Sequence, residues 1–251
     1  MNVSLIIPAF NEQARIQTTL ERYSQCLNIH YPNAYEIIVV TNGCTDQTVN
    51  VVLQFASSCS QVKLVDIPQP VGKGGAVLEG FRRANGKYIG FADADCATTP
   101  ESLIGLIDKL KDADIVIGSR WLPASQVIKK QPFLRRILSR LFNLSVRLLF
   151  QLPYRDTQCG AKAFLAAPAK VLTKVVKESR WTFDVDLLLW AKYYQFKVKE
   201  APVVWEDQEG SKILFRSTFR EVLSSLWSLK RSNNWQQPLE KSSLVQAEEL
   251  P

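Results

Sequence analysis

Two aspartates that follow an apolar segment are the strongest candidates for chemistry in this sequence. Asp93 and Asp95 come directly after residues 88–92, whose composition predicts a buried strand. Positions i and i+2 of extended chain project to the same side, so both carboxylates can hold one Mg²⁺ or Mn²⁺ against a diphosphate. Acidic residues also follow strands as turn or capping residues, and the pair alone leaves that interpretation open.

A glycine-rich segment at residues 71–76, Val-Gly-Lys-Gly-Gly-Ala, precedes a predicted helix that ends near Ala84. Backbone N–H groups at such a helix start can bind an anion. The segment is not a Walker A loop, because Lys73 is followed by Gly74 and not by Ser or Thr. Kinase and ATPase functions therefore lose support, and a tight strand-to-helix turn remains the structural alternative.

The elements that position these residues follow from alternating apolar segments and helical patterns. Strands are predicted at residues 3–8, 36–40, 62–67, 88–92, 114–118 and 198–205. Helices are predicted at residues 12–27, 46–56, 76–84, from 100 onward, 132–151 and 181–194. This order predicts an α/β fold with a mostly parallel sheet flanked by helices. Ligands of such sheets bind at the carboxyl ends of the strands, where both motifs lie.

The bulk composition fits one large folded domain and excludes several kinds of site. The 251 residues carry a formal charge of +7, which suits nucleic acid, an anionic membrane or phosphate-rich ligands. Five cysteines without a CxxC pair argue against a disulfide framework and a zinc site, and fit a cytosolic compartment. No signal peptide and no transmembrane helix are expected, because no run of ~20 uncharged apolar residues occurs.

A basic amphipathic helix is predicted at about residues 133–151. At ~100° per residue, its arginines fall within one arc of roughly 140°, and most of its large apolar residues lie on the other side. This arrangement is typical of a helix that lies in a membrane interface, although a core helix with a solvated arginine face is the alternative. No nucleic-acid-binding motif accompanies the positive charge. We therefore expect a membrane surface as a partner, and no nucleic acid.

Seven strings occur in order along the chain: IIPAFNE, NGCTDQT, GKGGAVLEGFRRANGKYIGFADAD, GSR, DTQCGAKAF, RWTFDVDLL and WEDQEGSK. Together they resemble the inverting glycosyltransferases with a GT-A (Rossmann-like) fold, specifically the dolichyl-phosphate glucose and dolichyl-phosphate mannose synthase group. The last three strings look closest to the dolichyl-phosphate β-glucosyltransferase branch. We expect a GT-A domain at residues 1–231, in which the helix at 133–151 is a C-terminal amphipathic membrane-surface element. A disordered tail is expected at 232–251.

The resemblance implies a donor site built from several segments: Pro8, Phe10, Glu12, Asn42, Lys73, Asp93, Asp95, Ser211 and Lys212. The first three residues would line the base and ribose pocket of a nucleotide-sugar. The two aspartates would bind the metal, and the lysine of the glycine-rich segment would lie near the nucleotide. The last two residues would belong to a loop that folds over the diphosphate.

Two positions depart from the family pattern. Residues 41–44 read Thr-Asn-Gly-Cys, where the family usually has Asp-Asp-Gly-Ser with an aspartate that accepts a hydrogen bond from the base. The side-chain oxygen of Asn42 can still accept one. Ala97 stands where mannose synthases tend to carry an amide side chain. One metal ligand is therefore expected to be missing or replaced by water.

The same resemblance implies residues for a lipid-phosphate acceptor. Arg120, in GSR, would approach the phosphates of the reacting groups. Arg135 and Ser139 match the Arg-x-x-x-Ser spacing with which mannose synthases grip the acceptor phosphate. Asp156 heads DTQCG, where related enzymes carry an acidic site residue. It would be either a positioning residue or an auxiliary base.

These roles predict a metal-dependent enzyme on the cytosolic face of a membrane. It would transfer a hexose from a nucleotide-sugar to a polyprenyl or dolichyl phosphate with inversion. The resemblance to the dolichyl-phosphate β-glucosyltransferase branch implies glucose as the sugar and UDP-glucose as the donor. The second pKa of a phosphate monoester is ~6, so the acceptor is largely dianionic at neutral pH and needs no general base. Two alternatives remain: transfer to a lipid or polysaccharide hydroxyl with Asp156 or Asp184 as the base, and a non-catalytic nucleotide-sugar binding module. Asp184 and Asp186 also fit a structural role, because acidic residues are favourable at a helix start.

Overall fold

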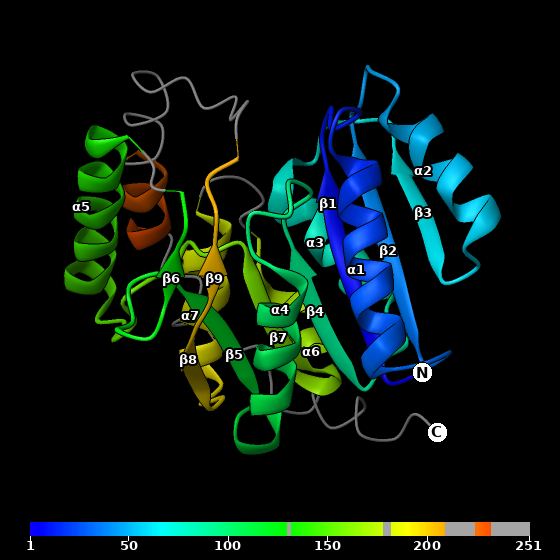
Figure 1. Cartoon of the computed structure of the whole chain (residues 1–251). Helices are drawn as coiled ribbons and strands as arrows, with labels where there is room; N and C mark the ends of the chain where they lie inside the picture. Colours follow the sequence, from blue (N-terminus) through cyan, green and yellow to red (C-terminus); the bar gives the residue numbers. More distant parts are fainter. Residues whose placement is uncertain (130–131, 178–181, 209–223, 232–251) are drawn as a thin grey trace.

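The computed structural model describes residues 1–129, 132–177, 182–208 and 224–231. Within these ranges the chain forms a seven-stranded sheet with the strand order β3-β2-β1-β4-β7-β5-β8 (Figure 1). Its strands are β1 (Val3–Ala9), β2 (Tyr35–Asn42), β3 (Val62–Ile67), β4 (Tyr88–Ala92), β5 (Ile115–Ser119), β7 (Ala161–Leu165) and β8 (Val198–Pro202). A small second sheet pairs β6 (Gln126–Val127) with β9 (Val204–Trp205). The labelled helices are α1 (Ile16–His30), α2 (Thr48–Ser58), α3 (Gly72–Arg83), α4 (Pro100–Asp108), α5 (Phe133–Phe150), α6 (Ala166–Val175) and α7 (Phe183–Tyr193), with a 3₁₀ turn at Lys109–Asp112. Residues 224–231 are also helical.

The predicted mostly parallel sheet is confirmed, with one strand that the sequence interpretation missed. β1 runs parallel to β2 and β4, β2 to β3, and β5 to β8. β7 lies between β4 and β5 and is antiparallel to both. Its five residues, AKAFL, include a lysine and form no continuous apolar run. That lysine, Lys162, is nevertheless fully buried.

The glycine-rich segment is part of a helix and not a turn before it. α3 begins at Gly72, so residues 72–75 form its first turn. α1 begins at Ile16, later than the predicted start at residue 12. α5 agrees with its prediction to within one residue at each end.

Helices cover both faces of the large sheet (Figure 1). One cluster of buried residues joins the sheet to α1, α2 and α4, and a second joins the opposite face to α3, α5, α6 and α7. β1 and β2 are buried at every position, as expected for central parallel strands. Among the described helices, none is both long and apolar enough to cross a bilayer.

The close approach of α3 to β1 gives a test of this packing. A Cβ atom added at Gly80 would lie 2.2 Å from Cγ2 of Ile6. We expect Gly80→Ala to lower the free energy of unfolding by about 1–3 kcal/mol, because overpacking forces the strand and helix apart. Denaturant unfolding followed by circular dichroism measures the change.

Gly105→Ala is the matched control, because Gly105 is also inside a helix but has no atom within 4 Å of an added Cβ. There the helix propensity of alanine should raise the stability by about 0.5–1 kcal/mol. Equal effects of the two substitutions would contradict the packing of α3 on β1.

Candidate active site

The carboxylate pair lies at the carboxyl end of β4, in a turn held by α1. The hydroxyl of Thr19 donates to the carbonyl of Ala94 at 2.7 Å, and the hydroxyl of Tyr23 donates to the carbonyl of Thr98 at 2.9 Å. Asp95 accepts a hydrogen bond from the backbone N–H of Ala97 at 3.0 Å. The sequence analysis missed both α1 anchors, although two polar residues four apart on an otherwise buried helix face were a signal.

Asp93 meets the glycine-rich helix start directly. Its Oδ1 lies 2.6 Å from Nζ of Lys73, in the first turn of α3. A Cβ atom added at Gly160 would lie 1.8 Å from the other carboxylate oxygen. Any other residue at position 160 would therefore push this carboxylate aside from its contact with the loop before β7. The two sequence motifs, predicted to share one edge of the sheet, are in contact.

The charge distribution at this edge fits a divalent cation. Burial and the neighbouring charge of Asp93 raise the pKa of Asp95 to about 6. Burial alone would lower the pKa of Lys73, but the carboxylates of Asp93 and Asp184 raise it above its ordinary value. Two crowded carboxylates are the donor set that Mg²⁺ or Mn²⁺ prefers. The described residues hold no cluster of three or more His, Cys, Asp or Glu, so substrate phosphate or water would have to complete the coordination shell.

The predicted base-binding residues lie at the carboxyl ends of β1 and β2. Pro8 and Asn42 are buried, whereas Phe10 is 48% exposed. The amide nitrogen of Asn42 donates to the carbonyl of Ala9 at 3.3 Å. The contact with β1 therefore uses the side-chain nitrogen of Asn42 and not its side-chain oxygen. This suits the predicted role of that oxygen as the acceptor of a hydrogen bond from the base. Glu12 forms an ion pair with Arg15 at 2.6 Å.

Asn11 joins the loops on which these residues lie, and the sequence analysis missed it. Its backbone has φ of 55°, in the left-handed region that asparagine tolerates. Its Oδ1 accepts from the backbone N–H of Thr45 at 2.8 Å and of Asp46 at 3.3 Å. The β1–α1 and β2–α2 loops are therefore fixed relative to each other.

Arg120 and Asp156 form a bidentate ion pair beyond the end of β5. Nε of Arg120 donates to Oδ2 at 2.7 Å and Nη2 donates to Oδ1 at 2.9 Å, and the Arg120 backbone N–H also donates to Oδ2. The two side chains are 10% and 2% exposed. Burial alone would raise the pKa of Asp156, but the Arg120 guanidinium and its hydrogen bonds hold it below its ordinary value. Asp156 is therefore a poor proton acceptor.

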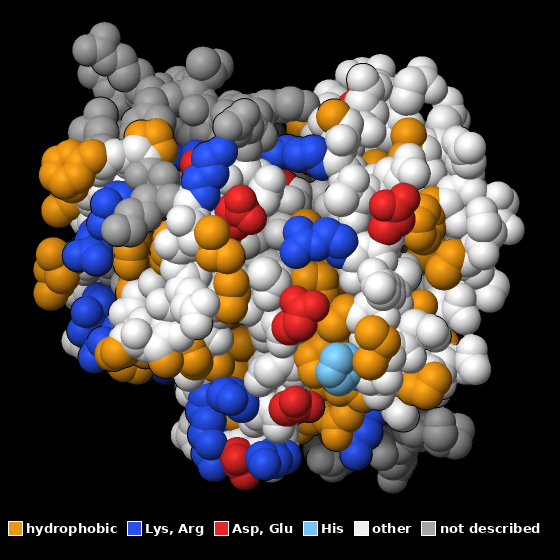
Figure 2. Space-filling model, in the orientation of Figure 1, with side chains coloured by type: hydrophobic (Ala, Val, Ile, Leu, Met, Phe, Trp, Pro, Cys, Tyr) orange, Lys and Arg blue, Asp and Glu red, His pale blue; other side chains and the backbone are white. Residues whose placement is uncertain are grey.

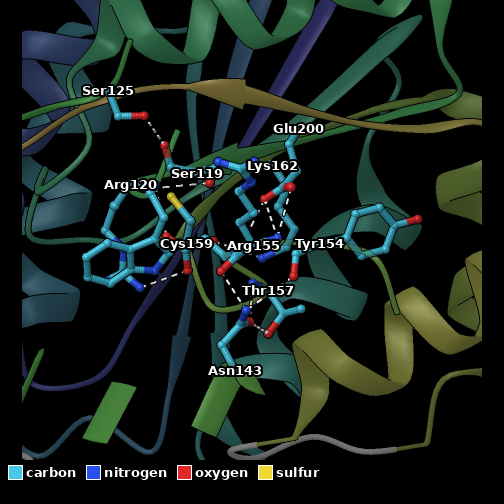
Figure 3. Close-up of polar contacts among 12 residues, drawn as sticks. Ser119, Arg120, Ser125, Asn143, Tyr154, Arg155, Thr157, Cys159, Lys162 and Glu200 are labelled. Atoms are coloured by element: carbon cyan, nitrogen blue, oxygen red, sulfur yellow. Dashed lines mark hydrogen bonds and ion pairs between the residues drawn. The ribbon is translucent and has the colours of Figure 1, made fainter. Parts of the chain in front are cut away.

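The loop that carries Asp156 is tied to two other elements (Figure 3). Glu200 of β8 accepts from the backbone N–H groups of Arg155 at 2.9 Å and Asp156 at 3.0 Å. Asn143 of α5 accepts from the backbone N–H and the hydroxyl of Thr157 at 3.0 and 2.9 Å. α5 is thus connected to the site by a buried polar contact as well as by apolar packing.

The second acidic pair, Asp184 and Asp186, has structural partners. Asp184 lies 2.5 Å from Nζ of the fully buried Lys162, which also donates to the carbonyl of Cys159. Asp186 accepts from the backbone N–H of Lys177 at 3.0 Å. These contacts favour the structural role over that of a catalytic base.

The remaining predicted site residues are less closely gathered. Nη1 of Arg135 lies 3.8 Å from Oδ1 of Asp207, and Ser139 lies one turn further along α5, partly buried. Ser211 and Lys212 fall outside the described residues. The roles given to these four residues, like those of the other predicted site residues, stay predictions.

Comparison with known proteins gives relatives over most of the chain. A dolichyl-phosphate β-glucosyltransferase of Dictyostelium discoideum is 33% identical and covers 91% of this chain and 77% of its own length. The Drosophila melanogaster protein of the same name is 35% identical, with coverages of 85% and 69%. Glycosyltransferase AglD of Haloferax volcanii is 31% identical over 91% of this chain, but the match spans only 38% of AglD.

Solved structures share the fold at lower identity. Glucosyl-3-phosphoglycerate synthase of Mycobacterium tuberculosis, in complex with Mn²⁺, UDP and glucosyl-3-phosphoglycerate, has a TM-score of 0.66 at 17% identity and covers 95% of this chain and 81% of its own. The mannosyltransferase PcManGT of Pyrobaculum calidifontis, in complex with GDP-Man and Mn²⁺, has a TM-score of 0.62 at 18% identity, with coverages of 98% and 68%. The predicted GT-A fold is therefore confirmed. Residues 4–172 match Glycosyl transferase family 2, and with relatives above 30% identity over most of its length the chain belongs to that family.

Proposed function

We propose that this chain transfers glucose from UDP-glucose to a dolichyl or polyprenyl phosphate, with inversion and with a divalent metal. The observation that carries the proposal is the contact of the Asp93–Asp95 turn with Lys73 at the carboxyl edge of the sheet. Two relatives with 33% and 35% sequence identity to this chain are named dolichyl-phosphate β-glucosyltransferases. Structural neighbours solved with UDP and Mn²⁺ support the donor and the metal.

The reaction is a single in-line displacement at the anomeric carbon. An oxygen of the acceptor phosphate forms a bond to this carbon, and the bond to the nucleoside diphosphate breaks, so the diphosphate leaves with the bonding electron pair. Asp93 and Asp95 would hold Mg²⁺ or Mn²⁺, which would neutralise the leaving diphosphate. Lys73 supplies a second positive charge beside them. Positioning and charge neutralisation are the tasks of the protein.

The arrangement of acids favours a phosphate acceptor over a hydroxyl acceptor. A hydroxyl would have to lose a proton to a base, and the two candidates were Asp156 and Asp184. Both oxygens of Asp156 accept from Arg120, and Asp184 is paired with Lys162. A phosphate dianion needs no such base. The turn around Asp93 and Asp95, which is intact, argues against a non-catalytic binding module.

The outer face of α5 supports attachment to the cytosolic surface of a membrane. Five large apolar side chains of this helix are 38–73% exposed: Phe133, Ile137, Leu141, Leu144 and Leu148. Figure 2 shows hydrophobic side chains next to lysine and arginine along the edge of the molecule that α5 forms in Figure 1. Exposed apolar residues beside basic residues suit an interface between acyl chains and anionic headgroups. A lipid acceptor would then lie in the same surface.

The transfer assay uses purified protein, a short polyprenyl phosphate, Mg²⁺ or Mn²⁺, and a panel of UDP- and GDP-sugars. We expect transfer from UDP-glucose that stops when EDTA is added. Asp93→Asn and Asp95→Asn should each lower kcat/KM by about 10²-fold or more, because the leaving charge loses its counter-ion.

Asp112→Asn is the matched control, since this exposed aspartate lies before β5, at the opposite edge of the sheet from the site. Its kcat/KM should equal that of the wild type. Nucleotide binding without transfer from any donor would favour the binding-module alternative. Full activity of Asp93→Asn or Asp95→Asn would contradict the proposed metal site.

The pH dependence of kcat/KM separates an ionising acceptor from an enzymatic base. We expect activity to fall below pH ~6, where the acceptor phosphate gains its second proton. Asp156 cannot cause this loss, because its pKa is lowered and it stays ionised. Replacement of the acceptor by its phosphonate analogue, whose second pKa is higher, should move the acidic limb upward at saturating metal. A limb at the same pH with both acceptors would mean that a group of the enzyme must ionise.

Attachment to membranes is tested by co-sedimentation with vesicles that contain anionic phospholipid. Leu141→Gln with Leu148→Gln should weaken binding at least about tenfold, because each buried leucine contributes roughly 1.5–3 kcal/mol. Leu53→Gln with Ile29→Gln is the control, since both residues are more than half exposed but lie on α2 and α1. Equal loss in the two double variants would exclude α5 as the membrane-binding face.

A further inference from the structure

One buried polar atom on the loop before β7 has no hydrogen-bond partner. Nε2 of Gln158 is shielded from solvent, and no acceptor lies within hydrogen-bond distance of it in the part of the chain that the structure describes. A buried donor without an acceptor destabilises the folded chain, so native proteins keep few of them and each one calls for an explanation. The proposed function gives Gln158 no role.

The position of Gln158 along this loop places it beside both halves of the proposed reaction centre. β7 pairs with β4 and with β5, so the loop before it leaves the sheet between the ends of these two strands. Two residues after Gln158, Gly160 lies against the carboxylate of Asp93. Two residues before it, Asp156 holds Arg120. Gln158 is therefore the midpoint of the segment that joins the proposed metal-binding turn to the Arg120 ion pair.

The residues on either side of Gln158 already hold the loop in place. The hydroxyl of Thr157 donates to Oδ1 of Asn143 at 2.9 Å (Figure 3). Cys159 is fully buried, and its sulfur lies 2.9 Å from a Cβ atom added at Gly118 in β5. The backbone of Gln158 is thus fixed on both sides by contacts of its neighbours. Its own amide nitrogen is left over as a group that does not stabilise the loop.

The unpartnered group is a neutral donor, so a ligand that matches it must offer an acceptor oxygen. The diphosphate of a nucleotide-sugar would find positive charge at Lys73 and at the metal that Asp93 and Asp95 would hold. The hydroxyl groups of the sugar carry no charge, and a hydroxyl oxygen can accept a hydrogen bond from an amide. A few placed amide and hydroxyl groups commonly orient small ligands in this way.

The geometry of an in-line displacement favours the hexose as the group that meets Gln158. The anomeric carbon has the leaving diphosphate on one side and the incoming acceptor on the other. Asp93 marks the side of the diphosphate, and Arg120 lies at the other end of the same loop segment. The part of the substrates that lies between these two ends is the hexose.

We propose that Gln158 recognises the sugar of the donor, with Nε2 donating a hydrogen bond to one hydroxyl group of the hexose. The identity of the donor as a nucleotide-sugar rests on the proposed function. The free protein keeps this buried donor unmatched, and the bound sugar supplies its acceptor. Gln158 thus contributes to the affinity for the sugar and not to the affinity for the nucleotide.

The test compares binding of UDP-glucose and of UDP to the full chain by calorimetry, with Mg²⁺ or Mn²⁺ and without lipid acceptor. Gln158→Met keeps the length of the side chain and removes its polar atoms. It should weaken binding of UDP-glucose about three- to tenfold and leave binding of UDP unchanged. The melting temperature should stay the same or rise, because an unmatched buried donor is removed. Gln54→Met is the matched control, since Gln54 is exposed on α2 and should change neither affinity.

A second measurement identifies the hydroxyl group and does not depend on the folding of a variant. The ligands are derivatives of UDP-glucose that each lack one hydroxyl group. One of them should bind to the wild type about three- to tenfold more weakly than UDP-glucose does. That derivative alone should bind equally well to the wild type and to Gln158→Met, because the hydrogen bond is absent from both complexes.

The outcomes separate this proposal from the proposed function. An unchanged ratio of the two affinities in Gln158→Met overturns the role of Gln158, since a buried water would then satisfy the amide. Equal weakening of UDP and UDP-glucose, or a lowered melting temperature with an unchanged ratio, overturns it in favour of a structural role. Wild-type binding that is the same for every derivative also overturns it. A selective loss of UDP-glucose binding supports the role of Gln158 even if no sugar is transferred to a lipid phosphate, which would contradict the proposed function alone.

Discussion

Arg120 and Asp156 form a bidentate ion pair in a position that solvent barely reaches. Removing two charges from water costs several kcal/mol for each ion, so the pair is stable only because its geometry and its extra hydrogen bonds are good. Asp156 receives three N–H donors, all from Arg120. The pair fixes the end of β5 against the loop before β7. Removal of either partner would leave an uncompensated charge at the centre of the site.

The ion pair divides the site into two regions of different charge. On one side lie Asp93 and Asp95 with Lys73, where the crowded carboxylates raise the pKa of Asp95. On the other side lie Arg136 and Arg140 of α5, which line a cavity beside Arg120 and have no carboxylate partner among the described residues. In the proposed reaction, the nucleotide diphosphate would depend on a metal at the acidic side, whereas a lipid phosphate would find its cations in the protein. Charge would then help to sort the two phosphate-bearing substrates.

The sequence predicts the parallel strands and the carboxylate pair because both are local patterns. Apolar segments of β1 and β2 and two aspartates after β4 can be recognised without knowledge of the rest of the fold. β7 could not be recognised, since Lys162 interrupts it and is buried only because Asp184 reaches it from another element. Gly160 and Thr19 escaped notice for the same reason: each acts through contact with a residue far along the chain. Which arginines of α5 face the site depends on the rotation of this helix about its own axis. A hydrophobic periodicity in the sequence determines that rotation only to within one residue.

The antiparallel strand that the sequence concealed explains why the site can be assembled at this edge. In a purely parallel sheet, the strand beside β4 would run in the same direction as β4 and would be reached through a helical crossover. Its N-terminal end would then lie at the edge opposite the site. β7 instead enters from the carboxyl edge, so the loop that precedes it lies among the strand ends. This loop brings Gly160 to Asp93 and Asp156 to Arg120. The same loop is bonded to Asn143 of α5. A helix that lies outside the sheet, with one face apolar and exposed, is thereby fixed relative to the Asp93–Asp95 turn. In the proposed reaction, this connection would let an acceptor at a membrane surface reach a donor bound over the sheet.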